Sequence, residues 1–354
     1  MDKKIKLLGL LVVLLLVVVA CSPTTTADDA DDSNGGEETT TENNGEETSS
    51  ESSESSSSSG AVAGAEGLHI IFVTHDLGAG VFAPVRGGME DACGLISAEC
   101  EFLGPQTYDP TEHVSILEAS IARGPDAIVT TRPEPGIYND VIAQARDAGI
   151  RVVAFNTNDP SADEELPVPF VGQDFTNYGV VWARAAMEDL PDGGEIAVTN
   201  CCFGHYALEE RIRSFEETLE NEGGGNYVVR DIIDTGADET EAFAAIEAYH
   251  QANPDIDAIY GVDYYSHVIA QYINNNDLQG ELKTGGSDMG PGNIEGLQEG
   301  YVSYGLGQNP YLQGFYPVMM IYLAESYDIR PVSIDTGTDV VTPENIDEYN
   351  PEYR

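Results

Sequence analysis

Polar side chains stand where several apolar runs of this sequence end. Six of them are His75, Asp76, Asn156, Asp263, Asp288 and Gln308. Carboxylates accept hydrogen bonds, whereas amides and neutral imidazoles both donate and accept them, so such a set can hold a polar ligand. The same residue types also cap helices and hold turns, which is the structural alternative for each position.

The apolar runs alternate with longer amphipathic segments. The runs that we expect to be strands are 68–74, 126–131, 151–156, 194–200, 227–233, 257–262, 282–287 and 302–307. The segments with helical periodicity include 110–124, 136–149, 208–222 and 240–254. Strands separated by helices of this length predict an α/β fold with parallel sheets and right-handed crossovers.

The order of these segments repeats after about 130 residues, which is the signature of a duplicated unit. Residues 107–131 have a counterpart at 235–261, where an acidic helix start, an apolar helix and an Asp-Ala-Ile strand follow in the same order. The repeat predicts two similar doubly wound, Rossmann-like domains. Ligands bind outside the carboxyl ends of parallel strands, so two facing domains bring both sets of polar residues around one cleft.

Residues 1–20 have the composition of an export signal. Lys3, Lys4 and Lys6 precede an apolar run over 7–20, which is shorter than the ~20 residues of a transmembrane helix. Cys21 follows small residues, as in the lipobox of bacterial lipoproteins. We therefore expect a lipid-modified Cys21 that holds the protein at the outer face of a cell membrane. A simple secreted protein with a chance cysteine is the alternative.

Charge separates the next segment from the rest of the chain. Residues 22–67 contain twelve acidic and no basic residues and are rich in Ser and Thr, so 21–67 is expected to be a disordered tether. From Leu68 onward 49 acidic residues accompany 12 basic ones. This negative charge argues against nucleic acid or anionic lipid headgroups as partners.

Four cysteines follow Cys21. In an exported protein, Cys93 with Cys100 and Cys201 with Cys202 can form disulfides, and buried free thiols are the alternative for all four. The cysteines lack zinc spacing, and the six histidines do not cluster in the sequence. We therefore expect neither a metal site nor a cofactor.

Residues 68 to about 322 resemble the periplasmic sugar-binding components of ABC importers, the ribose-binding-like group of type I solute-binding proteins. The phrases that carry the resemblance are FVTHDLGAGVFAPVRGGMEDA, GPQTYDPTEHVSILEASIARGPDAIV, FVGQDFTNYG, ALEERIRSFEETL, ANPDIDAIYGVD and GQNPYLQGFYP. The resemblance implies three crossings between two lobes, near Gly172, Gln308 and Thr336. It also implies an N-terminal lobe of 68–172 plus 309–335 and a C-terminal lobe of 173–308 plus 336–354.

The resemblance further implies which residues bind the ligand. Carried over position by position, they are His75, Phe82, Asn156, Asp174, Arg211, Asp263, Asp288 and Gln308, with Asp76 beside His75. The chemistry suits a polyol, because carboxylates accept from hydroxyls, Arg and amides donate to them, and aromatic rings stack on the C–H face of a sugar. Ribose binders carry Asp and Arg where this chain has Asn156 and Thr157, so another sugar is expected.

Some of these positions have specific alternatives. Phe82 can belong to the core face of the following helix, and Arg211 can pair at the surface with its neighbours Glu209 or Glu210. Asp174 can instead be the N-cap of a helix that begins at Phe175.

The expected function is a monomeric, non-enzymatic receptor that captures a sugar or polyol by hinged closure and delivers it to the permease of an ABC importer. A receptor that reports the same ligand to a chemoreceptor or sensor kinase is the alternative. A less favoured reading is an NAD-binding oxidoreductase, because Gly78, Gly80 and Ala83 fit G-x-G-x-x-A, and Glu101 lies twenty-one residues beyond Gly80.

Overall fold

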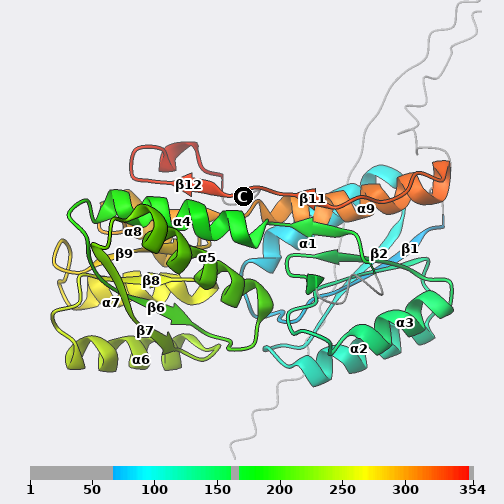
Figure 1. Cartoon of the computed structure of the whole chain (residues 1–354). Coiled ribbons are helices and arrows are strands. Elements are labelled where there is room, and N and C mark those ends of the chain that lie inside the picture. The colour runs from blue at the N-terminus through cyan, green and yellow to red at the C-terminus, as the bar shows by residue number, and fades with distance from the viewer. Residues whose placement is uncertain (1–66, 161–166, 351–354) are drawn as a thin grey trace, which may run out of the picture. The chain divides into compact units, whose positions relative to one another are not determined.

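The computed structural model describes residues 67–160 and 167–350 (Figure 1). The expected signal segment, Cys21 and most of the expected tether lie outside the described residues. Within the described ranges, no helix combines the length and apolar composition that crossing a membrane requires. The described chain forms two α/β halves, each built around a six-stranded sheet.

The first sheet has the strand order β11-β5-β4-β3-β1-β2, and all of its strand pairs are parallel. Its strands are β1 (His69–Val73), β2 (Glu99–Leu103), β3 (Ala127–Thr130), β4 (Arg151–Phe155), β5 (Phe170–Gly172) and β11 (Ile334–Asp335). Strands β1, β3 and β4 are almost wholly buried. Their continuous apolar runs follow from helices covering both faces of the sheet.

The second sheet has the corresponding order β12-β10-β9-β8-β6-β7, with β12 antiparallel to β10 at its edge. Its strands are β6 (Gly194–Asn200), β7 (Tyr227–Asp234), β8 (Ala258–Gly261), β9 (Lys283–Ser287), β10 (Tyr304–Gly307) and β12 (Asp339–Val341). The equal strand orders confirm the fold expected from the sequence repeat, two similar doubly wound domains.

Helices cover both faces of each sheet (Figure 1). In the first half α1 and α9 pack on one face and α2 and α3 on the other. In the second half α4 and α5 cover one face and α6 and α7 the other. The helices are α1 (Phe82–Ile96), α2 (Pro110–Ala122), α3 (Asn139–Asp147), α4 (Phe175–Asp189), α5 (Tyr206–Glu222), α6 (Glu239–Ala252), α7 (His267–Asn275), α8 (Pro291–Glu299) and α9 (Pro310–Tyr327). Two short 3₁₀ turns are η2 (Tyr264–Ser266) and η3 (Ile346–Glu348).

Equivalent helices of the two halves begin in the same way. Asp109 caps α2 by accepting from the backbone N–H groups of Thr111 and Glu112, and Asp238 caps α6 through the two corresponding N–H groups. Such a cap satisfies helix donors that have no partner within the helix, and it contributes about 1 kcal/mol. The repeated cap therefore fixes the same helix start in both halves.

Four of the described strands were not predicted from the sequence: β2, β5, β11 and β12. Strand β2 alternates Glu99, Cys100 and Glu101 and is only partly buried, so it lacks a continuous apolar run. The other three span two or three residues each. Such short strands form because a neighbouring strand has unpaired backbone N–H and C=O groups along its edge. The local sequence does not show whether such an edge lies nearby.

The chain passes between the sheets three times: after β5, after β10 and between β11 and β12. These places match the crossings expected near Gly172, Gln308 and Thr336. The side chain of Gln173 connects all three crossings, because its Nε2 donates to Gly307 O at 3.3 Å and to Gly337 O at 3.1 Å. One buried amide therefore ties the three connecting segments together.

Candidate functional site

A pocket lies between the two sheets, at the carboxyl ends of strands from both halves. It encloses about 70 Å³. Its lining includes eight residues expected from the sequence: His75, Asp76, Phe82, Asn156, Arg211, Asp263, Asp288 and Gln308. This is the place where ligands meet doubly wound sheets.

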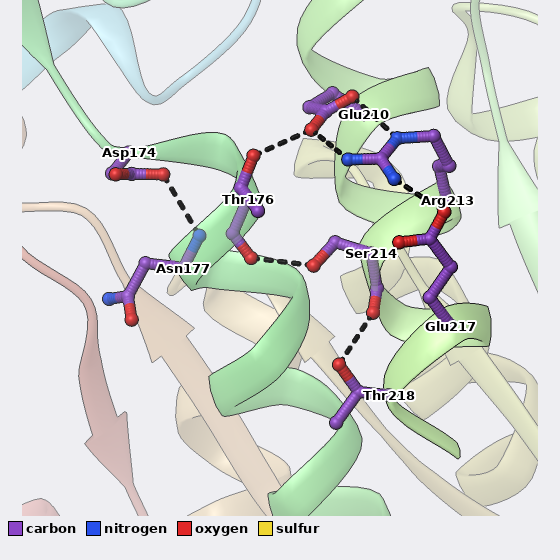
Figure 2. Close-up of polar contacts among 8 residues, drawn as sticks. All are labelled: Asp174, Thr176, Asn177, Glu210, Arg213, Ser214, Glu217 and Thr218. Carbon is purple, nitrogen blue, oxygen red and sulfur yellow. Dashed lines mark hydrogen bonds and ion pairs between the residues drawn. The ribbon is translucent and has the colours of Figure 1, made fainter. Parts of the chain in front are cut away.

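Asp174 is the expected site residue that the structure does not bring to this pocket. Its carboxylate is exposed and accepts from the backbone N–H of Asn177 at 2.9 Å, which makes it the N-cap of α4 (Figure 2). The helix that begins at Phe175 needs an acceptor for its free N–H groups, and the preceding aspartate supplies it.

Gln308 joins polar residues from the two halves. Asn156 Nδ2 donates to Gln308 Oε1 at 3.1 Å, and Gln308 Nε2 donates to Asp288 Oδ1 at 2.5 Å. Asn156 follows β4 in the first sheet, whereas Asp288 follows β9 in the second. The three side chains form a hydrogen-bonded chain at the second crossing that connects the two halves.

Arg211 is the cationic group of the pocket, and it is 4% exposed. Its Nη2 donates to Gln173 Oε1 at 2.6 Å, and its guanidinium lies 4.4 Å from the centre of the Tyr178 ring. Helices α4 and α5 can approach closely here because Gly179 lies against the Arg211 carbonyl, where a Cβ has no space. Gln173, at the first crossing between the sheets, is therefore hydrogen-bonded to a residue of the pocket lining.

The alternative of a surface ion pair for Arg211 is not what the structure shows. Arg213, two residues further along α5, is exposed, is absent from the pocket lining and pairs with Glu210 and Glu217 (Figure 2). Glu210 also accepts from Thr176 Oγ1 at 2.6 Å. The outer face of α5 therefore uses Arg213 for the surface pairing and leaves Arg211 for the pocket.

Two pocket carboxylates organise loops. Asp76 accepts from the backbone N–H of Gly78 at 2.8 Å, and Asp263 accepts from those of Cys201 and Tyr265, both at 2.8 Å. Burial raises the pKa of Asp263 to about 6, against the opposing effect of these hydrogen bonds. Burial likewise raises the pKa values of Asp76 and of Asp288. Asp76 and Asp263 thus combine a structural role with a position in the pocket lining.

Aromatic rings and imidazoles form one wall of the pocket. The His75 ring contacts Phe82, Tyr108 and His205, with centroids 5.2, 5.6 and 5.5 Å away. Burial lowers the pKa of His205 to about 3, and Arg211 adds to the effect. Burial also lowers the pKa of His75, with a further contribution from His205. Both imidazoles are therefore neutral near pH 7.

Phe82 contributes to both the core and the pocket. Its side chain is 3% exposed, and its ring packs edge-on against Phe155 in the core of the first half. It also belongs to the pocket lining. The core role expected for Phe82 is therefore confirmed, and its contact with a ligand stays a prediction.

Some lining residues were not singled out from the sequence. They are Tyr108, Thr157, His205, Tyr264 and Tyr265. Thr157 follows Asn156, and Tyr264 and Tyr265 follow Asp263. They would be found if the two residues after each expected site residue were also considered. Tyr108 and His205 lie in loops where nothing local marks them.

Both possible disulfides are present. One joins Cys93 of α1 to Cys100 of β2, outside the pocket lining. The other joins the neighbours Cys201 and Cys202, which follow β6 and line the pocket. The free-thiol alternative is therefore wrong for all four cysteines.

Four lining side chains carry a buried polar atom for which the described part of the chain supplies no hydrogen-bond partner. They are His75 Nδ1, Thr157 Oγ1, His205 Nδ1 and Arg211 Nε. An unpaired buried polar atom costs about 1–3 kcal/mol, so a ligand that hydrogen-bonds to these four atoms would recover that cost. A neutral imidazole can donate or accept, a hydroxyl can do both, and Arg only donates.

The glycine loop at 78–83 is closed by the other half of the molecule. A side chain at Gly80 would meet the ring of Tyr264, which comes from η2 of the second half. The acidic residue of the dinucleotide pattern, Glu101, bonds His69 and Arg123. The loop therefore does not present a free cradle for a pyrophosphate. In the described ranges no three His, Cys, Asp or Glu side chains cluster as a metal site.

Comparison with protein families identifies a family whose members this chain resembles over most of its described length. Residues 70–326 match the family described as "Periplasmic binding protein domain". The match spans both halves, including the pocket and the first two crossings between the sheets.

Individual relatives agree with this match. The chain is 30% identical over 295 residues to the xylose/arabinose-binding protein XylF of Sulfolobus acidocaldarius, covering 79% of this chain and 72% of the relative. Among solved structures, GanP, a glucose-galactose binding protein from Geobacillus stearothermophilus, superposes with a TM-score of 0.73 at 24% identity, covering 79% of this chain and 99% of that one. An ABC transporter solute-binding protein from Burkholderia graminis C4D1M in complex with D-arabinose gives 0.75 at 23% identity, covering 81% and 99%. At these identities the structural matches support the fold alone.

Proposed function

The chain belongs to the periplasmic binding protein domain family, and we propose that it captures a small sugar between its two lobes for delivery to an ABC importer. The sequence relative named as a xylose/arabinose-binding protein supports a pentose as the ligand class. The protein acts by binding, without catalysis and without a cofactor.

The observation that carries this proposal is the set of unpartnered polar atoms in the pocket. His75, Thr157, His205 and Arg211 come from both halves, and each leaves one buried donor or acceptor without a protein partner. A ligand with several neighbouring hydroxyls can complete all four at once, since each hydroxyl both donates and accepts. An apolar ligand leaves the desolvation cost of these atoms in place.

The proposed contacts are sufficient for useful affinity. The Asp288 carboxylate accepts from sugar hydroxyls while Arg211 Nε donates to one, and hydrogen bonds to charged groups contribute about 1.5–3 kcal/mol each. Micromolar binding corresponds to about 8 kcal/mol, so a few such bonds with one apolar ring contact reach it after the ordering cost.

Capture requires the halves to separate and close. The pocket of about 70 Å³ is smaller than the roughly 150 Å³ cavity that holds benzene, which has fewer non-hydrogen atoms than a pentose. We propose lobes of 68–172 plus 309–335 and of 173–308 plus 336–354 that move about the crossings. The amides of Gln173 and Gln308 lie at these crossings and bond pocket residues, so ligand contacts and closure are coupled.

Family membership implies a location outside the cytoplasm. Within this proposal, Cys21 carries lipid, residues 21–67 form the tether, and the monomeric binding domain moves above the membrane within reach of a permease. The excess of acidic residues keeps the binding domain soluble and away from anionic headgroups.

Thermal-shift measurements test the proposal directly. Purified protein is heated with D-xylose, L-arabinose, D-arabinose, D-glucose, D-galactose, D-ribose, xylitol, a nucleoside and NAD. We expect saturable stabilisation by at least one aldopentose or aldohexose and none by NAD, because ligands that bind only the folded state raise its stability. Stabilisation by NAD with no response to any sugar would overturn the proposal.

A further inference from the structure

We propose that the disulfide between Cys201 and Cys202 is the apolar surface on which the C–H face of the bound sugar ring lies. This inference rests on the proposed function and names the part of the same pocket that recognises a ring. The two residues immediately follow β6, an inner strand of the second sheet, and both line the pocket.

The backbone of this pair is already engaged by the protein. The N–H of Cys201 donates to Asp263 Oδ2 at 2.8 Å, and that of Cys202 donates to Asn200 Oδ1 at 2.9 Å. The carbonyl of Cys202 accepts from the N–H of His205 at 3.1 Å. With both N–H groups and the Cys202 carbonyl occupied, the pair offers mainly sulfur and methylene atoms to the pocket.

The surroundings agree with a surface of this kind. Cys201 and Cys202 are partly exposed, whereas Asn200 before them is buried, and both pack against the apolar core beneath α4 and α5. The pocket lining also includes the apolar side chains of Ala207 and Leu208, from the first turn of α5. The Asp263 carboxylate lies beside Cys201, from whose N–H it accepts, and Arg211 belongs to the same lining, so charged groups are available to hydroxyls at the ring edge.

The chemistry of the bond explains why a disulfide suits this place. Its sulfur atoms are polarisable and, unlike a serine or a thiol, carry no proton to donate, so they match C–H groups better than hydroxyls. The bond also joins adjacent residues into one small ring, which removes side-chain rotation that a ligand would otherwise have to restrict. The surface is therefore both apolar and fixed before the sugar arrives.

Reduction removes this surface. A phosphine supplies two electrons, the sulfur–sulfur bond breaks, and one water molecule gives its two protons to the two new thiols and its oxygen to the phosphine oxide. A dithiol supplies both the two electrons and the two protons and is itself oxidised to a disulfide. The separate thiols rotate freely and each adds a weak donor. Sugar affinity should therefore fall although the charged residues of the pocket are unchanged.

Two double variants separate this bond from the other one. Cys93→Ser/Cys100→Ser keeps the pocket disulfide, and Cys201→Ser/Cys202→Ser keeps the distant one. Calorimetric titration with D-xylose and D-glucose is run before and after a phosphine, with mass spectrometry counting free thiols. We expect Cys93→Ser/Cys100→Ser to bind as the wild type does and to lose about tenfold in affinity on reduction.

Cys201→Ser/Cys202→Ser should start about tenfold weaker and show no response to the phosphine. Wild-type affinity in this variant, or unchanged affinity in reduced Cys93→Ser/Cys100→Ser with two free thiols, overturns the inference and leaves the proposed function standing. If Cys201→Ser/Cys202→Ser fails to fold, the reduction experiment decides alone. If the oxidised wild type binds no sugar at all, the proposed function itself fails.

Discussion

Asn156 and Asp288 occupy equivalent positions in the two halves, and both have left-handed backbone conformations, with φ of 60° and 61°. Asn156 follows β4, Asp288 follows β9, and Gln308 bonds both side chains. Asn and Asp tolerate this conformation better than other residues with side chains, although it still costs energy. Strained residues cluster at binding sites, and the repeat has placed an amide and a carboxylate on either side of one crossing residue.

Asp288→Asn should separate affinity from stability. The variant keeps the shape and the left-handed backbone but loses the charged acceptor, so the Kd for D-xylose or D-glucose should rise about tenfold or more. Because burial raises the pKa of Asp288, its charge is unfavourable in the folded state, so the unfolding temperature without sugar should stay level or rise.

Calorimetry and thermal unfolding at pH 7 check both effects. Asp277→Asn is the matched control, since Asp277 also has positive φ but is exposed at the end of α7. It should change neither quantity. Unchanged sugar affinity in Asp288→Asn would remove this carboxylate from the binding site.

Arg211→Lys should weaken sugar binding by about tenfold to a hundredfold. Arg211 uses separate nitrogens for Val262 O and Gln173 Oε1 and keeps a third for the ligand, whereas the three donors of a lysine are on one nitrogen and cannot reach all three places. Arg213→Lys, on the same helix, touches only surface glutamates and should leave affinity unchanged. Titrations of the two variants under identical salt conditions test this difference. Equal behaviour of the two lysine variants would contradict the assignment of Arg211 to the pocket.

Gln173→Leu should loosen the connection among the three crossings. The variant loses the contacts to Gly307 O and Gly337 O and leaves Arg211 with one partner fewer. We expect weaker sugar binding and a larger radius of gyration without sugar by small-angle X-ray scattering. The exposed Gln279→Leu, which loses a bond to Asn274, serves as the control. A scattering curve identical to that of the wild type would argue against a role of Gln173 in closure.

His205 should make stability depend on pH. Its folded-state pKa is about 3, below the usual 6.5, so between these values the unfolded chain binds a proton that the folded chain does not. Its stabilising contribution is present above pH 6.5 and is lost as the pH falls toward 3, by up to about 1.4 kcal/mol per pH unit. Asp263, with a raised pKa of about 6, acts in the opposite direction between about pH 4 and 6.

The measurement is the difference in urea unfolding free energy between wild type and His205→Gln from pH 7 to pH 4. That difference should shift in favour of the variant as the pH falls, because glutamine has no proton to gain. The profile of Asp277→Asn should run parallel to that of the wild type. A constant difference between wild type and His205→Gln would show that His205 does not have the lowered pKa.

The fold was largely predictable because its signals are local. Buried parallel strands require continuous apolar runs, as in β1, β4 and β8. The first residue of a helix can be predicted from an N-cap residue such as Asp109 or Asp238. The same local logic explains the failures. Strand β2 mixes glutamates with apolar residues, and Asp174 is a helix cap that precedes α4 at a crossing, where it resembled a binding residue.

The sequence alone determined two doubly wound halves with polar residues at their strand ends, because hydrophobic periodicity and helix caps act over a few residues. Only the tertiary structure decided which of those residues meet. Gln173 contacts Gly307 and Gly337, which are 134 and 164 residues away, and Tyr264 fills the space beside Gly80. The surroundings of Cys201 and Cys202 likewise depend on the tertiary fold, which places Asp263 and Arg211 in the same pocket lining. Such contacts follow from the positions of whole elements, which no local pattern encodes.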